Sequence, residues 1–196
     1  MVSHTFYTQH TEEFYDFYKN KMIFLDAKPN KAHLKLAEME RAGKLSAIVT
    51  QNIDGLHQAA GSKNVFELHG SVHRNYCQKC GKFFDVNYVV NAKGVPYCDE
   101  CGGIIKPDVV LYEEGLDSQT INGAVRAISK ADMLIIGGTS LVVYPAAGMI
   151  DYFKGKYLAV LNRDATSRDK QADLCITDPI GEVPVSYTHL RAHETD

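Results

Sequence analysis

Two closely spaced cysteine pairs constrain the fold of this chain more than any other feature. Cys77 and Cys80 form the first C-x2-C pair, Cys98 and Cys101 form the second, and residues 81–97 separate the two. This spacing lets four thiolates surround one Zn²⁺ ion as a tetrahedron, with each sulfur about 2.3 Å from the metal. Because four thiolates leave no open position on the ion, we predict one structural, non-catalytic zinc per chain.

The segment that carries these cysteines differs from the rest of the chain. Residues 74–106 show no helical period and contain four glycines among their turns, so we predict a small zinc-ribbon module inserted in a larger domain. A nucleic-acid-binding ribbon is the alternative. We expect no direct nucleic-acid contact, because acidic side chains counter the cations of the module. These are Asp85, Asp99 and Glu100 against Arg74, Lys79, Lys82, Lys93 and Lys106. The fifth cysteine, Cys175, lies between Leu174 and Ile176, where a buried small hydrophobe is expected.

The remaining sequence has the pattern of an α/β fold. Short apolar runs at 47–49, 133–136 and 157–161 each end in small or polar residues, which predicts buried strands of a parallel sheet. Helical spacing lies between them. One helix should begin after Asn30 and stop at Gly43, a second should cover 121–128, and a third should start at Pro145. We therefore predict a Rossmann-like domain made of residues 1–73 and 107–183, which would bind ligands at the carboxyl ends of its strands.

Composition limits the classes of protein to consider. The 196 residues are 45% hydrophobic, which suits one globular domain with a small insert. The formal net charge is -3, so the chain has no strong basic field that would attract nucleic acid or an acidic membrane. The longest aliphatic run is far shorter than the roughly 20 residues that span a bilayer, and no secretory signal is visible. An odd number of cysteines argues against a disulfide framework, so we expect a cytoplasmic protein.

Polar motifs follow the first predicted strand. The segment Thr50–His57 comes directly after it, and Glu67–Ser71 comes next. Gly70 would let a ligand or another backbone segment approach the imidazole of His69, which could act as a base near neutral pH. Local sequence alone favours a hydrogen-bonded structural role for this histidine.

Two further features are weaker by themselves. His57 and His73 are expected to be structural histidines. The segment Gly137–Ser140 is a weak signal for a phosphate or ribose loop, because it lacks the full glycine spacing of a dinucleotide fingerprint.

In their order along the chain, these motifs resemble the sirtuin family of NAD-dependent protein deacylases, and most closely its bacterial branch. The resemblance runs from near the N-terminus to about Gly181. It rests on Thr50–His57, Glu67–Gly70, the two C-x2-C pairs, Lys106–Val110, Gly138–Leu141, Pro145–Ala147 and Leu161–Asn162.

The resemblance implies a reaction and a set of roles. Such enzymes consume NAD and transfer the acyl group of an acyl-lysine protein, releasing nicotinamide and O-acetyl-ADP-ribose. His69 matches the general base, and Asn52 belongs to the reacting pocket. The positions that match NAD contacts are Gln51, Asn52, Ile53 and Asp54 on the nicotinamide side, Gly138, Thr139 and Ser140 at the ribose and phosphates, and Asn162 and Ile180 at the adenosine. Val109, Val110 and Tyr112 match the strand that pairs with the acyl-lysine peptide.

The sequence also departs from the family pattern. We expect the sheet to be incomplete at the N-terminus, because the family's first strand and Gly-Ala-Gly loop have no counterpart here, and residues 184–196 read as an unstructured, non-family tail. Glu113 stands where many members have glycine. The alternative function is therefore a non-catalytic, zinc-stabilised remnant that at most binds peptides; mono-ADP-ribosyl transfer by the same site is a third.

Overall fold

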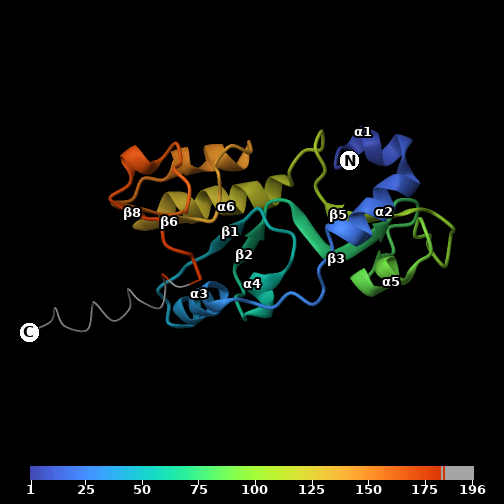
Figure 1. Cartoon of the computed structure of the whole chain (residues 1–196), viewed down its shortest axis with the longest axis horizontal. Coiled ribbons are helices and arrows are strands. Elements are labelled where there is room, and N and C mark those ends of the chain that lie inside the picture. The colour runs from blue at the N-terminus through green and yellow to red at the C-terminus, as the bar shows by residue number, and fades with distance from the viewer. Residues whose placement is uncertain (182, 184–196) are drawn as a thin grey trace, which may run out of the picture. The chain divides into compact units, whose positions relative to one another are not determined.

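A computed structural model describes residues 1–181 and 183, which form two compact units (Figure 1). The first unit contains residues 1–27, 50–55 and 67–117, and the second contains residues 28–49, 56–66 and the chain from 118 onward. The predicted tail at 184–196 lies outside the described residues. No helix in the described part of the chain is both long and apolar enough to cross a membrane.

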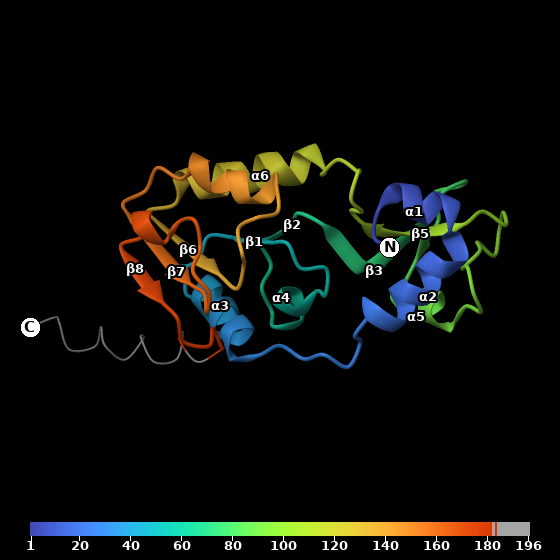
Figure 2. The same cartoon turned by 45° about the horizontal axis from the view of Figure 1, so that its top comes forward.

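The first unit is built on an antiparallel sheet in the order β4-β3-β5. Its strands are β3 (Gly70–Cys77), β4 (Phe83–Phe84) and β5 (Ile105–Val109). Helices α1 (His4–Gln9) and α2 (Thr11–Lys21) lie beside β3 and β5 in both views (Figures 1 and 2). The core forms where Phe14, Tyr15 and Tyr18 of α2, all with 0% exposure, pack among apolar residues of these strands.

The zinc module contains a helix that its sequence pattern did not indicate. Helix α5 covers Val86–Asn91, and the carboxylate of Asp85 caps it by accepting from the N–H of Tyr88. The expectation of a helix-free segment at 74–106 was therefore wrong on this point. Six residues are too few to display a helical period, although Val86 and Val89 share its buried face.

The second unit holds the parallel part of the fold. Its three-stranded sheet has the order β6-β7-β8, with β6 (Met133–Gly137), β7 (Tyr157–Leu161) and β8 (Leu174–Ile176) all parallel. Helix α6 (Ser118–Lys130) buries Ala124 and Ile128, and it is followed by the 3₁₀ helices η1 (Ala146–Tyr152) and η2 (Asp169–Gln171). Crossovers between parallel strands confirm the predicted Rossmann-like architecture.

A smaller sheet belongs to the same α/β pattern. Strands β1 (Ile48–Thr50) and β2 (Val65–Glu67) pair with each other, and the chain passes into the first unit at the end of each strand. Helices α3 (Lys31–Arg41) and α4 (Leu56–Ala59) flank these strands in the sequence. Asn30 caps α3 by accepting from the N–H of His33, as expected for a helix that starts after Asn30.

Burial of the second unit agrees with the sequence in its central strand and differs at its edges. Leu158–Leu161 of β7 are all buried, because this strand has a neighbour on each side. On β6, Met133 and Ile135 are 45% and 42% exposed, although a buried strand was predicted. Cys175 on β8 is exposed as well, so its predicted burial was wrong. Within the described residues, both strands pair with β7 alone, so each is an edge strand with one neighbour fewer than β7.

Candidate functional site

The four thiols of the C-x2-C pairs converge in the first unit. The Sγ atoms of Cys77 and Cys101 lie 3.4 Å apart, those of Cys80 and Cys98 lie 3.7 Å apart, and all four fall within 4.8 Å of one another. Four sulfurs bound to one zinc at about 2.3 Å are roughly 3.8 Å apart. The predicted ligand set thus fits a structural zinc and leaves no position for a substrate.

The surroundings of Cys77 lower the pKa of its thiol. Burial raises the pKa of its thiol, but the N–H groups of Cys80 and Lys79 stabilise the thiolate and lower that pKa to about 6. The N–H of Lys79 is 3.4 Å from the sulfur. Backbone N–H groups that point at the sulfur favour the thiolate, which is the form of cysteine that ligates a metal.

His69 is held by the backbone of the Thr50–His57 motif. Its Nδ1 lies 3.0 Å from the carbonyl oxygen of Gln51. Since a carbonyl only accepts, Nδ1 carries the proton, and this leaves Nε2 as the basic nitrogen of the neutral ring. The imidazole is half-buried. Its position suits proton transfer at Nε2.

Gly70 explains how His69 comes to lie next to β5. Gly70 has φ +72° and pairs with Val109, and a Cβ on it would meet the carbonyl oxygen of Asp108 at 1.9 Å. The close approach expected at this glycine is thus made by backbone. One residue further, the N–H of Val110 donates to the carbonyl of His69 at 3.0 Å.

The loop after β1 contains the other predicted residues of the nicotinamide side. The N–H of Asn52 donates to Oγ1 of Thr50 at 3.0 Å, and Nδ2 of Asn52 lies 3.5 Å from a carboxylate oxygen of Asp54. Ile53 packs against the core of the unit. Gln51, Asn52, Ile53 and Asp54 therefore share one short loop with the contact to His69.

The predicted peptide strand has most of its main-chain groups already paired. The N–H of Tyr112 donates to the carbonyl of Val2, and the carbonyl of Tyr112 accepts from the N–H of His4, so Ser3 and Tyr112 form a parallel bridge. Val110 uses its N–H on His69. Within the described residues, the Val110 carbonyl has no hydrogen-bond partner and is available to an added peptide.

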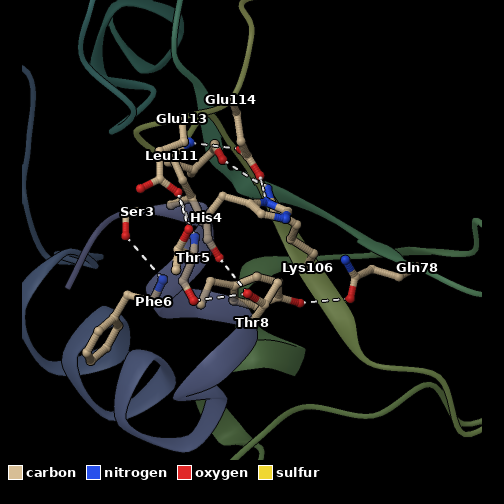
Figure 3. Close-up of polar contacts among 12 residues, drawn as sticks. Ser3, His4, Thr5, Phe6, Thr8, Gln78, Lys106, Leu111, Glu113 and Glu114 are labelled. Carbon is tan, nitrogen blue, oxygen red and sulfur yellow. Dashed lines mark hydrogen bonds and ion pairs between the residues drawn. The ribbon is translucent and has the colours of Figure 1, made fainter.

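Two consecutive carboxylates fasten this strand to helix α1 (Figure 3). Glu113, with φ +78°, accepts from the N–H of Thr5 at 2.8 Å and from its hydroxyl at 2.7 Å. Glu114 accepts from Nδ1 of His4, from Nζ of Lys106 and from the N–H of Leu111.

These contacts lower the pKa of both carboxyl groups. The Thr5 hydroxyl and N–H lower the pKa of Glu113. Burial raises the pKa of Glu114, but the bonds from Leu111, His4 and Lys106 outweigh it and leave that pKa lowered.

A cavity in the second unit gathers the remaining predicted NAD residues. It has a volume of about 390 Å³ and lies at the carboxyl ends of β6, β7 and β8. Gly138, Thr139, Ser140, Asn162 and Ile180 all line it. Sequence reasoning missed its other lining residues Arg163, Asp164, Ala165, Asp178 and Pro179. Their position directly after strand ends was the available signal.

The predicted residues are thus divided between the two units. The base, the nicotinamide-side loop and the peptide strand lie in the first unit, which also contains the cysteine cluster. The ribose, phosphate and adenosine residues share the cavity of the second unit. Their roles toward NAD and peptide stay predictions.

A family model and curated relatives all match this chain to the same family of proteins. A model of the Sir2 family matches residues 1–145. A relative from Clostridium acetobutylicum, named NAD-dependent protein deacetylase, is 66% identical over 184 residues, which cover 93% of this chain and 75% of the relative. A protein of the same name from Clostridium perfringens is 63% identical with the same coverage.

Solved structures agree with this match. One described as "Sir2-p53 peptide-NAD+" superposes with a TM-score of 0.91 at 38% identity, covering 98% of this chain and 82% of that chain. Another, of Sir2 with an inhibitor, 2'-O-acetyl-ADP-ribose and a deacetylated p53 peptide, has a TM-score of 0.90 at 40% identity and covers 97% and 84%.

Proposed function

This chain belongs to the Sir2 family, and from that premise we propose that it is an NAD-dependent protein lysine deacetylase with His69 as general base. Its substrates are acyl-lysine proteins, NAD is its co-substrate, and one structural zinc holds the four cysteines. The observation that carries the proposal is the contact of Nδ1 of His69 with the carbonyl of Gln51, which leaves Nε2 free to accept a proton.

Each group of residues has a task in this reaction. When bound, NAD would supply the ribose carbon that the acyl oxygen of the substrate attacks, with nicotinamide as the leaving group and O-acetyl-ADP-ribose and free lysine as the further products. His69 takes a proton from a ribose hydroxyl at Nε2, while Gln51 and Asn52 hold the ribose hydroxyls. Ile53 and Asp54 receive the nicotinamide. Exclusion of water from the reacting groups when both substrates are bound would favour transfer to the acyl oxygen over hydrolysis.

The second unit would hold the other half of the co-substrate. Thr139 and Ser140 follow β6, where Gly138, with φ +62°, turns the chain, and they would contact the ribose and phosphates. Asn162 and Ile180 would contact the adenosine. The cavity contains all of them, which supports the assignment.

The acyl-lysine peptide would add to the strand Val109, Val110 and Tyr112. The unpaired carbonyl of Val110 supports this role. At Tyr112 the side chain, 64% exposed, is the available part, since Val2 and His4 occupy its main-chain groups.

Two further expectations, on location and on domain organisation, accompany this proposal. We propose a cytoplasmic location, because the zinc site requires reduced thiols. We also propose that residues 74–106 form a module within a domain made of 1–73 and 107–183.

The direct test measures the removal of acetyl groups from a lysine peptide with and without NAD. We expect NAD-dependent deacetylation that falls at least about 100-fold in His69→Ala. His10→Ala, which alters an exposed histidine between α1 and α2, is the matched control and should retain activity. Activity that survives His69→Ala would contradict the assignment of the base.

The alternative functions predict different results. A zinc-stabilised remnant would bind about one zinc per chain yet show no saturable shift of its melting temperature with NAD. An ADP-ribosyl transferase would leave label from NAD on a target protein instead of releasing O-acetyl-ADP-ribose.

A further inference from the structure

Strand β3 is interrupted where it pairs with β5. Ser71 lies opposite Asp108 and Asn75 lies opposite Pro107, so residues 72–74 have no counterpart on β5. Asn75 closes the interruption: its side chain is fully buried, and its Nδ2 donates to the carbonyls of Val72 at 3.1 Å and Phe84 at 3.3 Å. Such a bulge releases residues from the ladder and redirects them, often beside active sites.

Two of the released residues hold the loop at Gln51–Gly55. The N–H of Val72 donates to the carbonyl of Ile53 at 3.0 Å. Nε2 of His73 lies 3.0 Å from the carbonyl oxygen of Asp54 and must donate to it, since a carbonyl only accepts. The ring of His73 lies against Gly55, where a Cβ would come within 2.7 Å of its Cδ2.

The third released residue connects two other segments. Nε of Arg74 donates to Asp108 at 2.7 Å, and its Nη1 donates to Glu67 at 2.7 Å. Burial lowers the pKa of Arg74, but the bonds to Glu67 and Asp108 outweigh this and raise it, so the guanidinium stays charged. Glu67 stands two residues before His69, and Asp108 immediately precedes Val109.

We propose that His73 and Arg74 are positioning residues with separate targets: His73 fixes the loop that receives NAD, and Arg74 fixes the strand that receives the acyl peptide. The inference rests on the proposed function. Its structural basis is that two neighbouring residues of one bulge contact different segments: His73 contacts the loop at Asp54 and Gly55, and Arg74 contacts Asp108 on β5 and Glu67.

The first test separates the two targets by kinetics. His73→Phe keeps an aromatic ring over Gly55 but removes the donor to Asp54. We expect its KM for NAD to rise about three- to tenfold, the effect of one lost hydrogen bond, with the KM for peptide unchanged. His73→Gln restores a donor and should recover most of the wild-type KM for NAD.

The second variant addresses the other segment. Arg74→Met keeps the length of the side chain and removes both bonds, so the KM for peptide should rise about tenfold while the KM for NAD stays within twofold. Arg74→Lys can reach one carboxylate at a time and should lie between Met and wild type. Zinc content and melting temperature are recorded for every variant.

A readout without turnover keeps this inference apart from the proposed function. Equilibrium binding of NAD, measured by calorimetry, should weaken about three- to tenfold in His73→Phe and remain unchanged in Arg74→Met.

Unchanged KM values, or equal rises for both substrates in both variants, would overturn the positioning roles. If NAD binds to wild type and weakens only in His73→Phe, but no deacetylation occurs, the proposed function fails while the role of His73 stands. Wild type that does not bind NAD overturns both.

Discussion

Gly70 shows how one residue can determine the geometry of a site. It lies directly after His69, has φ +72°, and leaves no room for a side chain, since a Cβ would lie 1.9 Å from the backbone oxygen of Asp108. Gly94 has a similar φ of +66° but nothing within 4 Å of the same position. The two glycines thus separate the cost of backbone strain from the cost of a steric clash.

We expect Gly70→Ala to destabilise the protein by more than about 3 kcal/mol, because strain and clash act together and the β3–β5 pairing must shift. Gly94→Ala should cost only about 1 kcal/mol, which is the strain of the left-handed backbone alone. Denaturant unfolding measures both changes. Equal losses in the two variants would show that the clash at Gly70 is relieved elsewhere.

At the scale of elements, the stability of the loop after β5 depends on ionised carboxylates. Glu113 joins this loop to the start of α1 through Thr5 (Figure 3). Its pKa is lower in the folded chain than in the unfolded chain, so the carboxylate stabilises the fold above about pH 4.3. That contribution disappears as the pH falls through the folded pKa.

Glu113→Gln should therefore be less stable than wild type at pH 6, with the difference shrinking as the pH falls from about 5 to 3. Denaturant unfolding of the two proteins at matched pH tests this, because effects of acid on the zinc site are common to both. Thr5→Val, which removes one of the two donors, should show part of the difference. A stability gap that stays constant with pH would contradict a lowered pKa of Glu113 in the folded chain.

The zinc module is the second element whose stability depends on a charged centre. Four thiols within 4.8 Å of one another repel as thiolates unless a cation lies between them. Cys98 belongs to this cluster, whereas Cys175 is exposed on β8 and outside it.

Cys98→Ser should reduce bound zinc well below one per chain and lower the melting temperature, while Cys175→Ser should change neither. Metal analysis and thermal unfolding provide the two readouts. Full zinc content in Cys98→Ser would rule out the four-cysteine ligand set.

At the scale of the whole molecule, the chain folds as two compact units with separate cores. The core of the first unit contains the aromatic residues of α2 and buried Cys77 and Cys98, and the second unit has two apolar clusters built on β6, β7 and β8. All four cysteines of the cluster lie in the first unit, so loss of zinc removes support from that core alone.

We expect a chelator to speed amide hydrogen exchange in β3, β4, α5 and β5 by at least tenfold, and to leave β6, β7 and β8 within about twofold of the zinc-bound protein. Exchange measured segment by segment by mass spectrometry would detect this. A uniform increase across both units would mean that the two cores unfold as one.

The sequence by itself determined the features whose partners are close along the chain. The zinc ligands follow from the two C-x2-C spacings, and the helix at Lys31–Arg41 follows from its cap and apolar period. The predicted NAD residues follow from the resemblance to the sirtuin family, and several of them line one cavity. Tertiary structure alone decided which distant groups meet. The register of β3 against β5 creates the bulge that directs Arg74 to Asp108. The pairing of Val2 and His4 with Tyr112 occupies the main-chain groups of Tyr112, whereas the Val110 carbonyl has no hydrogen-bond partner among the described residues. The exposure of Cys175 was decided in the same way, because burial depends on how many neighbours a strand acquires and local sequence does not record that number.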